Sequence, residues 1–471
     1  MGAFAPIAVC QRYNMNYNEF LQKKAVSIPC CGFSIEKSDL NPKMFEWQKD
    51  IVVWALKKGK AALFEDCGLG KTIQQLEWCN QISAHTDKPT LILAPLAVSR
   101  QTKREGLKFG YAVNICRSQD DVRAGINITN YEMLDKFDLA VFGGVALDES
   151  SILKQYGGKM RTQIIDSCRN IPYKLSCTAT PAPNDYMELG NQAEFLGVMR
   201  RTEMLAEFFV HDGGDTSKWR LKGHAEKDFW AWLTSWAVVL TTPADLGYNS
   251  TGYELPKLKI RYVDVKSDAP VASTLSERRD ARRHSLTARC KAARRIIDTD
   301  PTAQWLIWCD LNDEADMLRE TIPGSREVRG SDSAERKELR LAAFSEQLLP
   351  KLITKPSIAG FGMNWQCCHN MIFVGLSDSY ELLYQAIRRC WRFGQSETVH
   401  VYIITSTAEG AVRENIERKD AQCKQMVAEM VKHTREILEK DIRATVRMTD
   451  KYEPSKDMLL PAWLIEGGYA V

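Results

Sequence analysis

The chain has 471 residues, with 63 lysines and arginines against 60 aspartates and glutamates, and a formal net charge of +3. This length predicts two to four domains and excludes a single small domain. A nearly neutral balance of charge gives no overall attraction to nucleic acid, so any such binding must come from a local groove.

The cysteines and the apolar runs indicate the compartment. Fourteen cysteines form no CxxC pair, and the clusters Cys30-Cys31 and Cys367-Cys368-His369 make poor tetrahedral ligand sets. The N-terminus, MGAFAPIAVC, lacks a basic stretch before a long apolar core, and no run reaches the eighteen apolar residues of a membrane helix. We therefore expect a soluble cytoplasmic protein with reduced thiols, no zinc and no membrane partner.

From residue 60, short apolar runs alternate with glycine-containing or polar turns and helical periods. This alternation is typical of parallel α/β layers. The expected strands are 61–64, 90–95, 112–116, 126–129, 141–148 and 173–177. Each ends where a motif begins, and open parallel sheets bind ligands at the carboxyl ends of their strands.

A second series of apolar runs predicts a second α/β lobe. Its expected strands are 304–310, 325–330, 351–357, 370–376 and 399–405. Residues 195–255 are rich in aromatics and predict a helical insertion, and the charged pattern from Ala408 to about Thr445 predicts a long helix packing across the lobes. The predicted parts are an N-terminal extension (1–40), a first lobe (41–194), the insertion (195–255), a second lobe (256–406) and a C-terminal brace and tail (407–471).

The stretch EDCGLGKT, residues 65–72, has the form of a phosphate-binding loop. It follows an expected strand and precedes a helical pattern, so its glycines would let backbone amides converge on an anion at a helix N-terminus. Glu65 stands where the usual loop has its first glycine, and Gly68 and Gly70 supply the flexibility instead. Lys71 would reach the β- and γ-phosphates and Thr72 would bind Mg²⁺. We favour a nucleotide site over an ordinary glycine turn.

Two further motifs carry charge at the expected site. Asp148 and Glu149 end the strand 141–148, where an aspartate can hold Mg²⁺ and a glutamate can polarise the attacking water; a helix N-cap is the plainer alternative. In QAIRRCWRFGQ, residues 385–395, Arg389 and Arg392 are three apart and hence on one face. Two guanidinium groups offered from a separate lobe suit an arginine finger, although a basic helix face is the alternative.

Taken in order, these stretches resemble superfamily two helicases, specifically Swi/Snf-like ATPases in a compact form like those of bacteriophages. EDCGLGKT is similar to motif I of that family, DESS (148–151) to motif II, SCTATP (176–181) to motif III, SIAGFGMNWQ (357–366) to motif V and QAIRRCWRFGQ to motif VI. The resemblance runs from about Phe45 to Ser406. It implies two RecA-like parallel-sheet lobes in tandem, a helical insertion in the first lobe and a C-terminal helical brace.

The resemblance also implies roles for residues that spacing alone does not mark. Gln48 and Gly362 would bind the nucleotide, and Gln385 would belong to the catalytic set. Thr178, Ala179 and Thr180 would couple hydrolysis to movement of the lobes. Pro95, Thr129, Thr354 and Asn364 would contact the nucleic-acid backbone.

Two patches are open to more than one interpretation. The run 278–295 carries eight lysines and arginines, and it is either a solvated helix or a salt-dependent DNA contact. The aromatics of 195–255 could stack on bases, although Trp232 and Trp236, spaced i to i+4, are more often part of a core.

The implied function is ATP hydrolysis with Mg²⁺, driving translocation on DNA in phage replication, recombination or repair. Duplex or forked DNA is favoured over single strands, and replication or nuclease proteins are expected partners. An RNA helicase is the alternative within the same chemistry. A signalling or scaffold NTPase that does not translocate is the alternative from another class, and stimulation of hydrolysis by nucleic acid discriminates between them.

Overall fold

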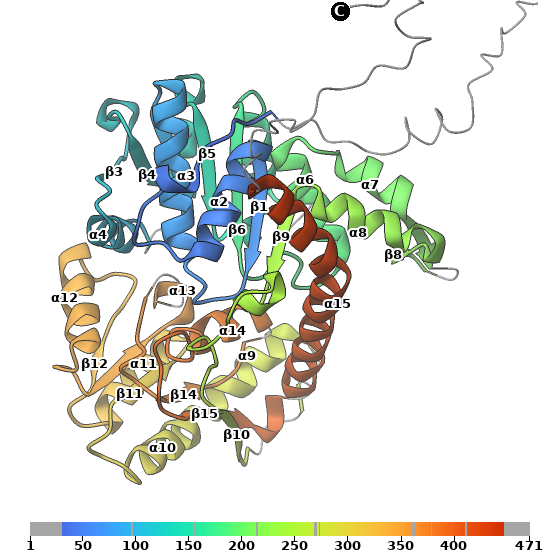
Figure 1. Cartoon of the computed structure of the whole chain (residues 1–471). Coiled ribbons are helices and arrows are strands. Elements are labelled where there is room, and N and C mark those ends of the chain that lie inside the picture. The colour runs from blue at the N-terminus through green and yellow to red at the C-terminus, as the bar shows by residue number, and fades with distance from the viewer. Residues whose placement is uncertain are drawn as a thin grey trace, which may run out of the picture.

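Two α/β lobes and one long helix make up the described part of the protein (Figure 1). The computed structural model describes residues 31–95, 98–154, 157–212, 215–267, 271–272, 274–359, 363–377, 379–409 and 412–446. Most of the predicted N-terminal extension, the tail beyond residue 446 and Gly362 lie outside these residues.

The first lobe is built on a seven-stranded parallel sheet in the order β3-β4-β2-β5-β6-β1-β9. Its strands are β1 (Lys60–Glu65), β2 (Thr90–Ala94), β3 (Val113–Ile115), β4 (Ile126–Asn130), β5 (Gly144–Asp148), β6 (Tyr173–Thr178) and β9 (Ala237–Leu240). Its helices include α2 (Glu46–Lys58), α3 (Lys71–Thr86), α4 (Ser99–Phe109), α5 (Lys159–Ser167) and α6 (Leu189–Leu196). Strands such as TLILA in β2 are buried along their whole length, as expected where helices cover both faces of a sheet.

The second lobe is built on a six-stranded parallel sheet in the order β10-β15-β14-β11-β13-β12. Its strands are β10 (Leu258–Val265), β11 (Trp305–Trp308), β12 (Arg326–Glu327), β13 (Lys351–Thr354), β14 (Asn370–Val374) and β15 (Val399–Ser406). Its helices are α9 (Leu275–His284), α10 (Leu286–Ile297), α11 (Asn312–Thr321), α12 (Ala334–Ser345), α13 (Pro356–Ala359) and α14 (Tyr380–Ile387). The prediction of two parallel-sheet lobes in tandem is confirmed.

Short 3-10 helices connect many of these elements. They span Lys37–Asp39, Gln119–Asp121, Tyr131–Lys136, Leu139–Val141, Ser150–Lys154, Tyr186–Glu188, Gly223–Ala225, Pro243–Leu246 and Thr407–Glu409.

The segment 195–255 contains more than helices. Helices α7 (Arg201–Phe208) and α8 (Glu226–Thr234) project from the first lobe together with the antiparallel hairpin of β7 (Phe209–Asp212) and β8 (Asp215–Leu221) (Figure 1). Strand β9 then returns to pair with β1 at the edge of the first sheet, so this segment also completes that lobe. Trp232 and Trp236 are buried, which confirms their interpretation as core residues.

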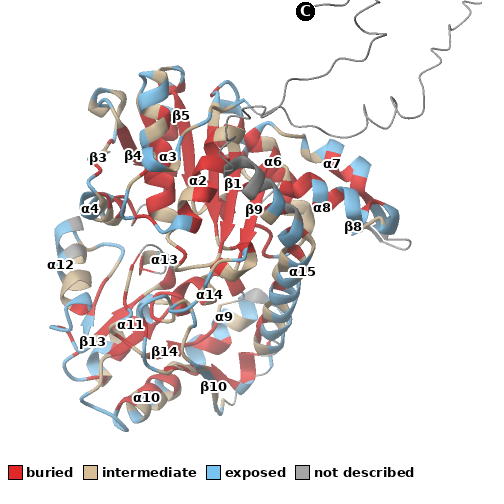
Figure 2. Ribbon diagram, viewed as in Figure 1, coloured by how far each residue is buried: buried red, intermediate tan, exposed pale blue. Residues whose placement is uncertain are grey.

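Helix α15 (Val412–Val446) runs from the second lobe along the first and confirms the predicted brace (Figure 1). Ile416 packs into the second lobe's core, whereas Met430 and Leu438 pack on the two sides of the first lobe's sheet. Much of its outer surface is exposed (Figure 2). The His433 ring stacks on Trp230 of α8, with ring centroids 5.1 Å apart. Within the described residues, no helix is long and apolar enough to cross a membrane.

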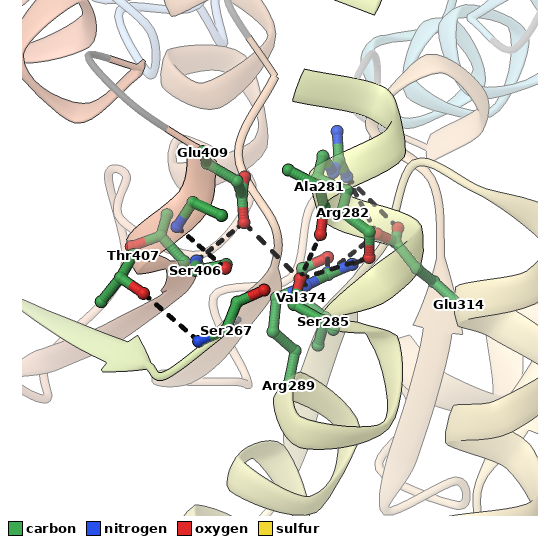
Figure 3. Close-up of polar contacts among 12 residues, drawn as sticks. Ser267, Ala281, Arg282, Ser285, Arg289, Glu314, Val374, Ser406, Thr407 and Glu409 are labelled. Atoms are coloured by element: carbon green, nitrogen blue, oxygen red, sulfur yellow. Dashed lines mark hydrogen bonds and ion pairs between the residues drawn. The ribbon is translucent and has the colours of Figure 1, made fainter. Parts of the chain in front are cut away.

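Part of the basic run 278–295 is a buried ionic network, an outcome that neither interpretation had predicted (Figure 3). Arg289 on α10 donates to Glu314 Oε1 at 2.8 Å and to the Val374 carbonyl at 2.9 Å, and both charged side chains are fully buried. Arg282 on α9 contacts the same Glu314 oxygen at 3.1 Å. Although burial raises the pKa of Glu314, the two guanidinium groups outweigh it and hold the pKa below its usual range. These arginines stabilise the second lobe and are not available to a polymer.

Candidate active site

The loop between β1 and α3 has the backbone of an anion-binding site. Gly68 and Gly70 have φ of 95° and 82°, in the left-handed region that favours glycine. A side chain at Gly68 would lie 3.1 Å from Phe393 Cβ, and one at Gly70 would lie 2.4 Å from Gln48 Nε2. Helix α3 begins directly after the loop, so the unpaired amides of its first turn could bind an anion there.

Lys71 lies within this loop, and its ammonium group donates to the Glu65 carbonyl at 2.6 Å and to the Asp66 carbonyl at 3.0 Å. Glu65 itself is fully buried and accepts from Gln74 Nε2 at 2.8 Å. Burial raises the pKa of Glu65 to about 7, against the opposing effect of Lys71. The acidic residue at the usual glycine position is therefore part of the buried support of the loop.

Asp148 and Glu149 stand at the carboxyl end of β5, at the same edge of the sheet as Lys71. Burial and then the charge of Glu149 raise the pKa of Asp148 to about 7, and burial raises the pKa of Glu149; Lys71 opposes both shifts. Glu149 has φ of 55°, an uncommon conformation for a residue with a side chain. The Tyr131 hydroxyl donates to the Asp148 carbonyl at 2.7 Å.

The donors at this edge suit Mg²⁺. The carboxyl groups of Asp148 and Glu149 follow one another at this edge, and the hydroxyl oxygens of Ser150 and Thr180 are buried without a hydrogen-bond partner in the described structure. No group of three or more His, Cys, Asp or Glu side chains in the described ranges is arranged to hold a metal alone. That combination fits Mg²⁺, which is usually held by one or two carboxylates together with substrate phosphates.

The segment Thr178–Thr180 begins at the last residue of β6, the strand beside β5. The Thr180 amide donates to Thr178 Oγ1 at 3.1 Å, so the two threonines form one local turn. Behind them, Ser176 donates to Gln192 Oε1 at 2.5 Å, and Gln192 donates to the Ser150 carbonyl at 3.0 Å. These hydrogen bonds connect Ser176, near the end of β6, to the residue after Glu149, and no motif in the sequence marks them.

The second lobe reaches Glu149 through α14. Gln385 Nε2 donates to Glu149 Oε2 at 3.5 Å. Arg389 Nη2 donates to Gln385 Oε1 at 3.0 Å, and Arg389 Nη1 donates to the Met363 carbonyl at 3.3 Å. Arg392 Nη1 reaches the same Met363 carbonyl at 3.3 Å. Arg389 and Arg392 therefore converge on one acceptor, with Gln385 between Arg389 and Glu149.

Arg388, which the sequence analysis passed over, is the arginine that contacts the phosphate-binding loop. Its guanidinium Nη2 lies 2.9 Å from Asp66 Oδ2 and 2.5 Å from the Cys67 carbonyl. Tyr384, one turn earlier, donates its hydroxyl to Asp66 Oδ1 at 2.5 Å. The only sequence signal was the presence of a third arginine in the same stretch.

An aromatic cluster also lies beside the phosphate-binding loop, where Phe393 faces Gly68. Tyr253 contacts Phe393 of the second lobe, with centroids 5.0 Å apart, and Phe45 and Trp47 of the first lobe at 6.1 and 5.9 Å. Phe45 and Phe393 are exposed. Gln48 is buried next to them; its Oε1 accepts from the Phe45 amide at 3.1 Å and its Nε2 donates to the Leu69 carbonyl at 2.8 Å.

The predicted nucleic-acid contacts are differently placed. The Thr129 hydroxyl donates to the Cys116 carbonyl at 2.8 Å, and the Thr354 hydroxyl donates to the Val328 carbonyl at 3.3 Å; both side chains are buried. These hydroxyl groups are thus not at the surface of this structure, and their predicted role stays a prediction. Pro95 lies just after β2, and Asn364 Nδ2 donates to Glu105 Oε1 of α4 at 2.9 Å, across the lobes.

Comparisons with known proteins show a similarity of fold to solved structures. No protein-family model and no curated protein matches the chain. Among solved structures, the chain is similar to the SWI2/SNF2 ATPase core of Sulfolobus solfataricus in complex with dsDNA, at 17% identity and a TM-score of 0.40. The similarity covers 88% of this chain and 100% of that one. We base the functional proposal on the contacts between the lobes.

Proposed function

We propose that this protein is an ATPase of the superfamily two helicase type, which hydrolyses ATP between its two lobes and uses the cycle to translocate along DNA. The observation that carries the proposal is the contact of Gln385 with Glu149, because it joins the second lobe to the acidic residue next to the phosphate-binding loop. An enzyme that needed only one lobe for hydrolysis would have no use for this contact.

ATP would bind with its phosphates on the loop amides, Gly68, Gly70 and Lys71, and with its base near Gln48. The Gln48 amide uses one hydrogen and one lone pair within the protein, so one donor and one acceptor remain for an adenine edge. Tyr253 and Phe393 offer aromatic faces beside it. Gly362, from the family resemblance, would add a contact from the second lobe.

Asp148 and Thr72 would hold Mg²⁺, which when bound neutralises charge on the phosphates and orients them. Glu149 then accepts a hydrogen bond from the attacking water, and Gln385 fixes the orientation of the Glu149 carboxylate. Arg389 and Arg392 would stabilise the charge that develops on the transferred phosphoryl group once the lobes close fully.

Movement would be coupled to hydrolysis through the turn of Thr178, Ala179 and Thr180. The turn comes directly after the segment that contains Ser176, and Ser176 is linked through Gln192 to the residue after Glu149. Pro95, Thr129, Thr354 and Asn364 would contact the polymer backbone. The contact of Asn364 with Glu105 supports a polymer path across both lobes, because it lies between α4 and the loop before β14.

The deciding experiment is the ATPase rate with no polymer, single-stranded DNA, duplex DNA, forked DNA and RNA. We expect the largest stimulation by duplex or forked DNA. Stimulation by RNA alone would favour the RNA helicase, and hydrolysis unaffected by any polymer would favour the scaffold or signalling NTPase.

We further propose a role in replication, recombination or repair of bacteriophage DNA in the host cytoplasm. The sequence shows no nuclease, methylase or zinc module, so replication or nuclease proteins would supply any further chemistry. Affinity purification from infected cells, followed by identification of the bound proteins, tests this role.

A further inference from the structure

Arg388 makes a buried ion pair with the phosphate-binding loop of the other lobe. Its side chain is 2% exposed, and that of its partner Asp66 is 27% exposed. A guanidinium group so far removed from water is costly unless it is paired and hydrogen-bonded. Here it contacts both the Asp66 carboxylate and the Cys67 carbonyl, so the second lobe satisfies this charge only while it lies against the loop.

The surroundings of Arg388 fix its direction. The guanidinium lies 5.1 Å from the ring centroid of Trp391 and 5.8 Å from that of Tyr384. Trp391 is itself held by a 2.7 Å hydrogen bond from its indole nitrogen to the Pro256 carbonyl, where the chain enters the second lobe. Tyr384 reaches the other oxygen of the same Asp66 carboxylate. Arg388 and Tyr384, one helical turn apart, thus both contact the carboxylate of Asp66.

Asp66 belongs to the part of the phosphate-binding loop that contacts Lys71. The Asp66 carbonyl accepts from Lys71 Nζ at 3.0 Å, and the Asp66 carboxylate accepts from the Cys67 amide at 2.6 Å. A displacement of the Asp66 side chain would therefore move the loop backbone whose carbonyl accepts a hydrogen bond from Lys71. Within the described part of the chain, the hydrogen bonds of Arg389 and Arg392 go to Gln385 and Met363 and not to this loop.

We propose that Arg388, with Tyr384, is a positioning clamp that holds the second lobe against the phosphate-binding loop independently of ATP and polymer. The clamp sets how far closed the lobes are at rest, and hence how much of the closure a polymer must supply. It acts through Asp66 and does not touch the reacting atoms. Its regulatory consequence rests on the proposed function, whereas the clamp itself is a property of the ligand-free protein.

Loss of the clamp has an effect distinct from loss of a catalytic group. If Arg388 is removed, the ligand-free lobes open more often, so hydrolysis without polymer falls and more polymer is needed to restore closure. At saturating polymer the closed state is recovered. We expect Arg388→Ala to raise the half-stimulating concentration of DNA about tenfold, within the usual range of coupling between two sites, with a maximal rate close to that of the wild type.

The clamp is tested first without ATP or DNA. Small-angle X-ray scattering measures the spacing of the lobes, and amide hydrogen exchange measures opening at residues 66–70 and 388–395. We compare Arg388→Ala, Arg388→Lys, Asp66→Asn, Tyr384→Phe and the double variant Asp66→Asn/Arg388→Ala. The control is Arg283→Ala on α9, which removes an exposed arginine of the same lobe whose partner is Asp280 on its own helix.

We expect a larger radius of gyration and faster exchange in both peptides for Arg388→Ala and Asp66→Asn, and no change for the control. Arg388→Lys restores part of the protection, and the double variant resembles the single ones because both remove one interaction. If Arg388→Ala does not fold, Tyr384→Phe and Asp66→Asn still report opening.

Wild-type spacing and exchange in the folded Asp66, Tyr384 and Arg388 variants would overturn the clamp. If no polymer changed the ATPase rate of the wild-type enzyme, the proposed function would be overturned instead. The comparison of lobe spacing and hydrogen exchange in the ligand-free variants would still test the clamp. A maximal rate that stays low at saturating DNA in Arg388→Ala would also overturn the clamp, because it would assign Arg388 to the chemical step.

Discussion

Gln385 of the second lobe donates its side-chain amide to Glu149 of the first lobe at 3.5 Å, although 236 residues separate them in the chain. Glu149 has a left-handed backbone conformation directly after β5, which is uncommon for a residue with a side chain. The contact means that the carboxylate proposed to polarise water is oriented from both lobes. Separation of the lobes would leave it without that support.

Glu149→Gln is the most direct test of the assignment. The substitution keeps the size of the side chain but removes the carboxylate, and it leaves Lys71 and Asp148 in place for ATP and Mg²⁺. We expect ATP binding to persist while DNA-stimulated hydrolysis falls by at least about a hundredfold, the lower range for loss of a general base. Nucleotide binding by fluorescence and phosphate release measure the two effects, with exposed Glu346→Gln as the control. Normal turnover by Glu149→Gln would contradict the assignment.

Lys71→Ala should abolish turnover and weaken ATP binding. The loop amides alone would leave the charge of the β- and γ-phosphates largely uncompensated, and Asp148 and Glu149 would lose the cation that opposes their raised pKa values. Equilibrium nucleotide binding and steady-state hydrolysis are the measurements. Lys227→Ala, on the exposed side of α8, removes a lysine far along the chain and should retain both properties. Hydrolysis by Lys71→Ala at near wild-type rate would remove the phosphate-binding loop from the mechanism.

Glu65 gives a pH dependence of stability with a definite sign. Burial raises its pKa to about 7, so between about pH 4.5 and 7 the folded state binds more protons than the unfolded state, and stability falls as pH rises. Glu65→Gln removes this titration, and its amide finds an acceptor in the Gln74 side-chain oxygen, which is buried without a partner in the described structure. We expect the free energy of unfolding of Glu65→Gln, relative to that of the wild type, to increase by up to roughly 3 kcal/mol between pH 5 and 8. Urea unfolding at a series of pH values measures it, and a constant difference would contradict it.

Much of the fold could be predicted because its strands are short apolar runs between clear turns. All eleven expected strands form, including the two-residue β12 within 325–330. Strand β9 was missed because AVVL is only four residues long, lies in an aromatic-rich helical segment and pairs with β1, more than 170 residues earlier. Strand β10 was missed because it lies at a sheet edge and none of its residues is buried, so its sequence lacks an apolar run.

The grouping of the candidate site residues was predictable where it depends on spacing along the chain, and not where it depends on the direction in which side chains point. Periodicity alone places Tyr384 with Arg388 on one face of the chain and Gln385 with Arg389 on another. Periodicity does not predict which of the two faces contacts the first lobe. In the structure both faces do, one at Asp66 and the other at Glu149. Likewise, the burial of Arg282 and Arg289 depends on Glu314 of α11, a partner that no local pattern in the basic run reveals.

Polymer binding should be directed to the backbone and only weakly dependent on sequence. The candidate contacts are loop residues such as Pro95 and Asn364, and we assign none of the described helices to reading base edges. If six or more phosphates are engaged, affinity should fall by about three orders of magnitude or more between 50 and 200 mM salt. Fluorescence anisotropy with duplexes of unrelated sequence measures this. Equal affinity at both salt concentrations, or strong preference for one site in a random-sequence selection, would contradict it.

Arg389→Ala and Arg392→Ala separate chemistry from positioning. Both arginines point to the Met363 carbonyl, and Arg389 also holds Gln385, so full closure must redirect at least one guanidinium group toward the γ-phosphate. Loss of a finger in phosphoryl-transfer enzymes costs about 10³ to 10⁵ in rate. We expect each variant to keep ATP and DNA binding but to lose most of the stimulated rate at every DNA concentration, whereas Arg388→Ala recovers at saturation. If both arginines only support the Met363 carbonyl, each alanine variant would keep its maximal rate and lose stability alone, and the two-lobe mechanism would fail.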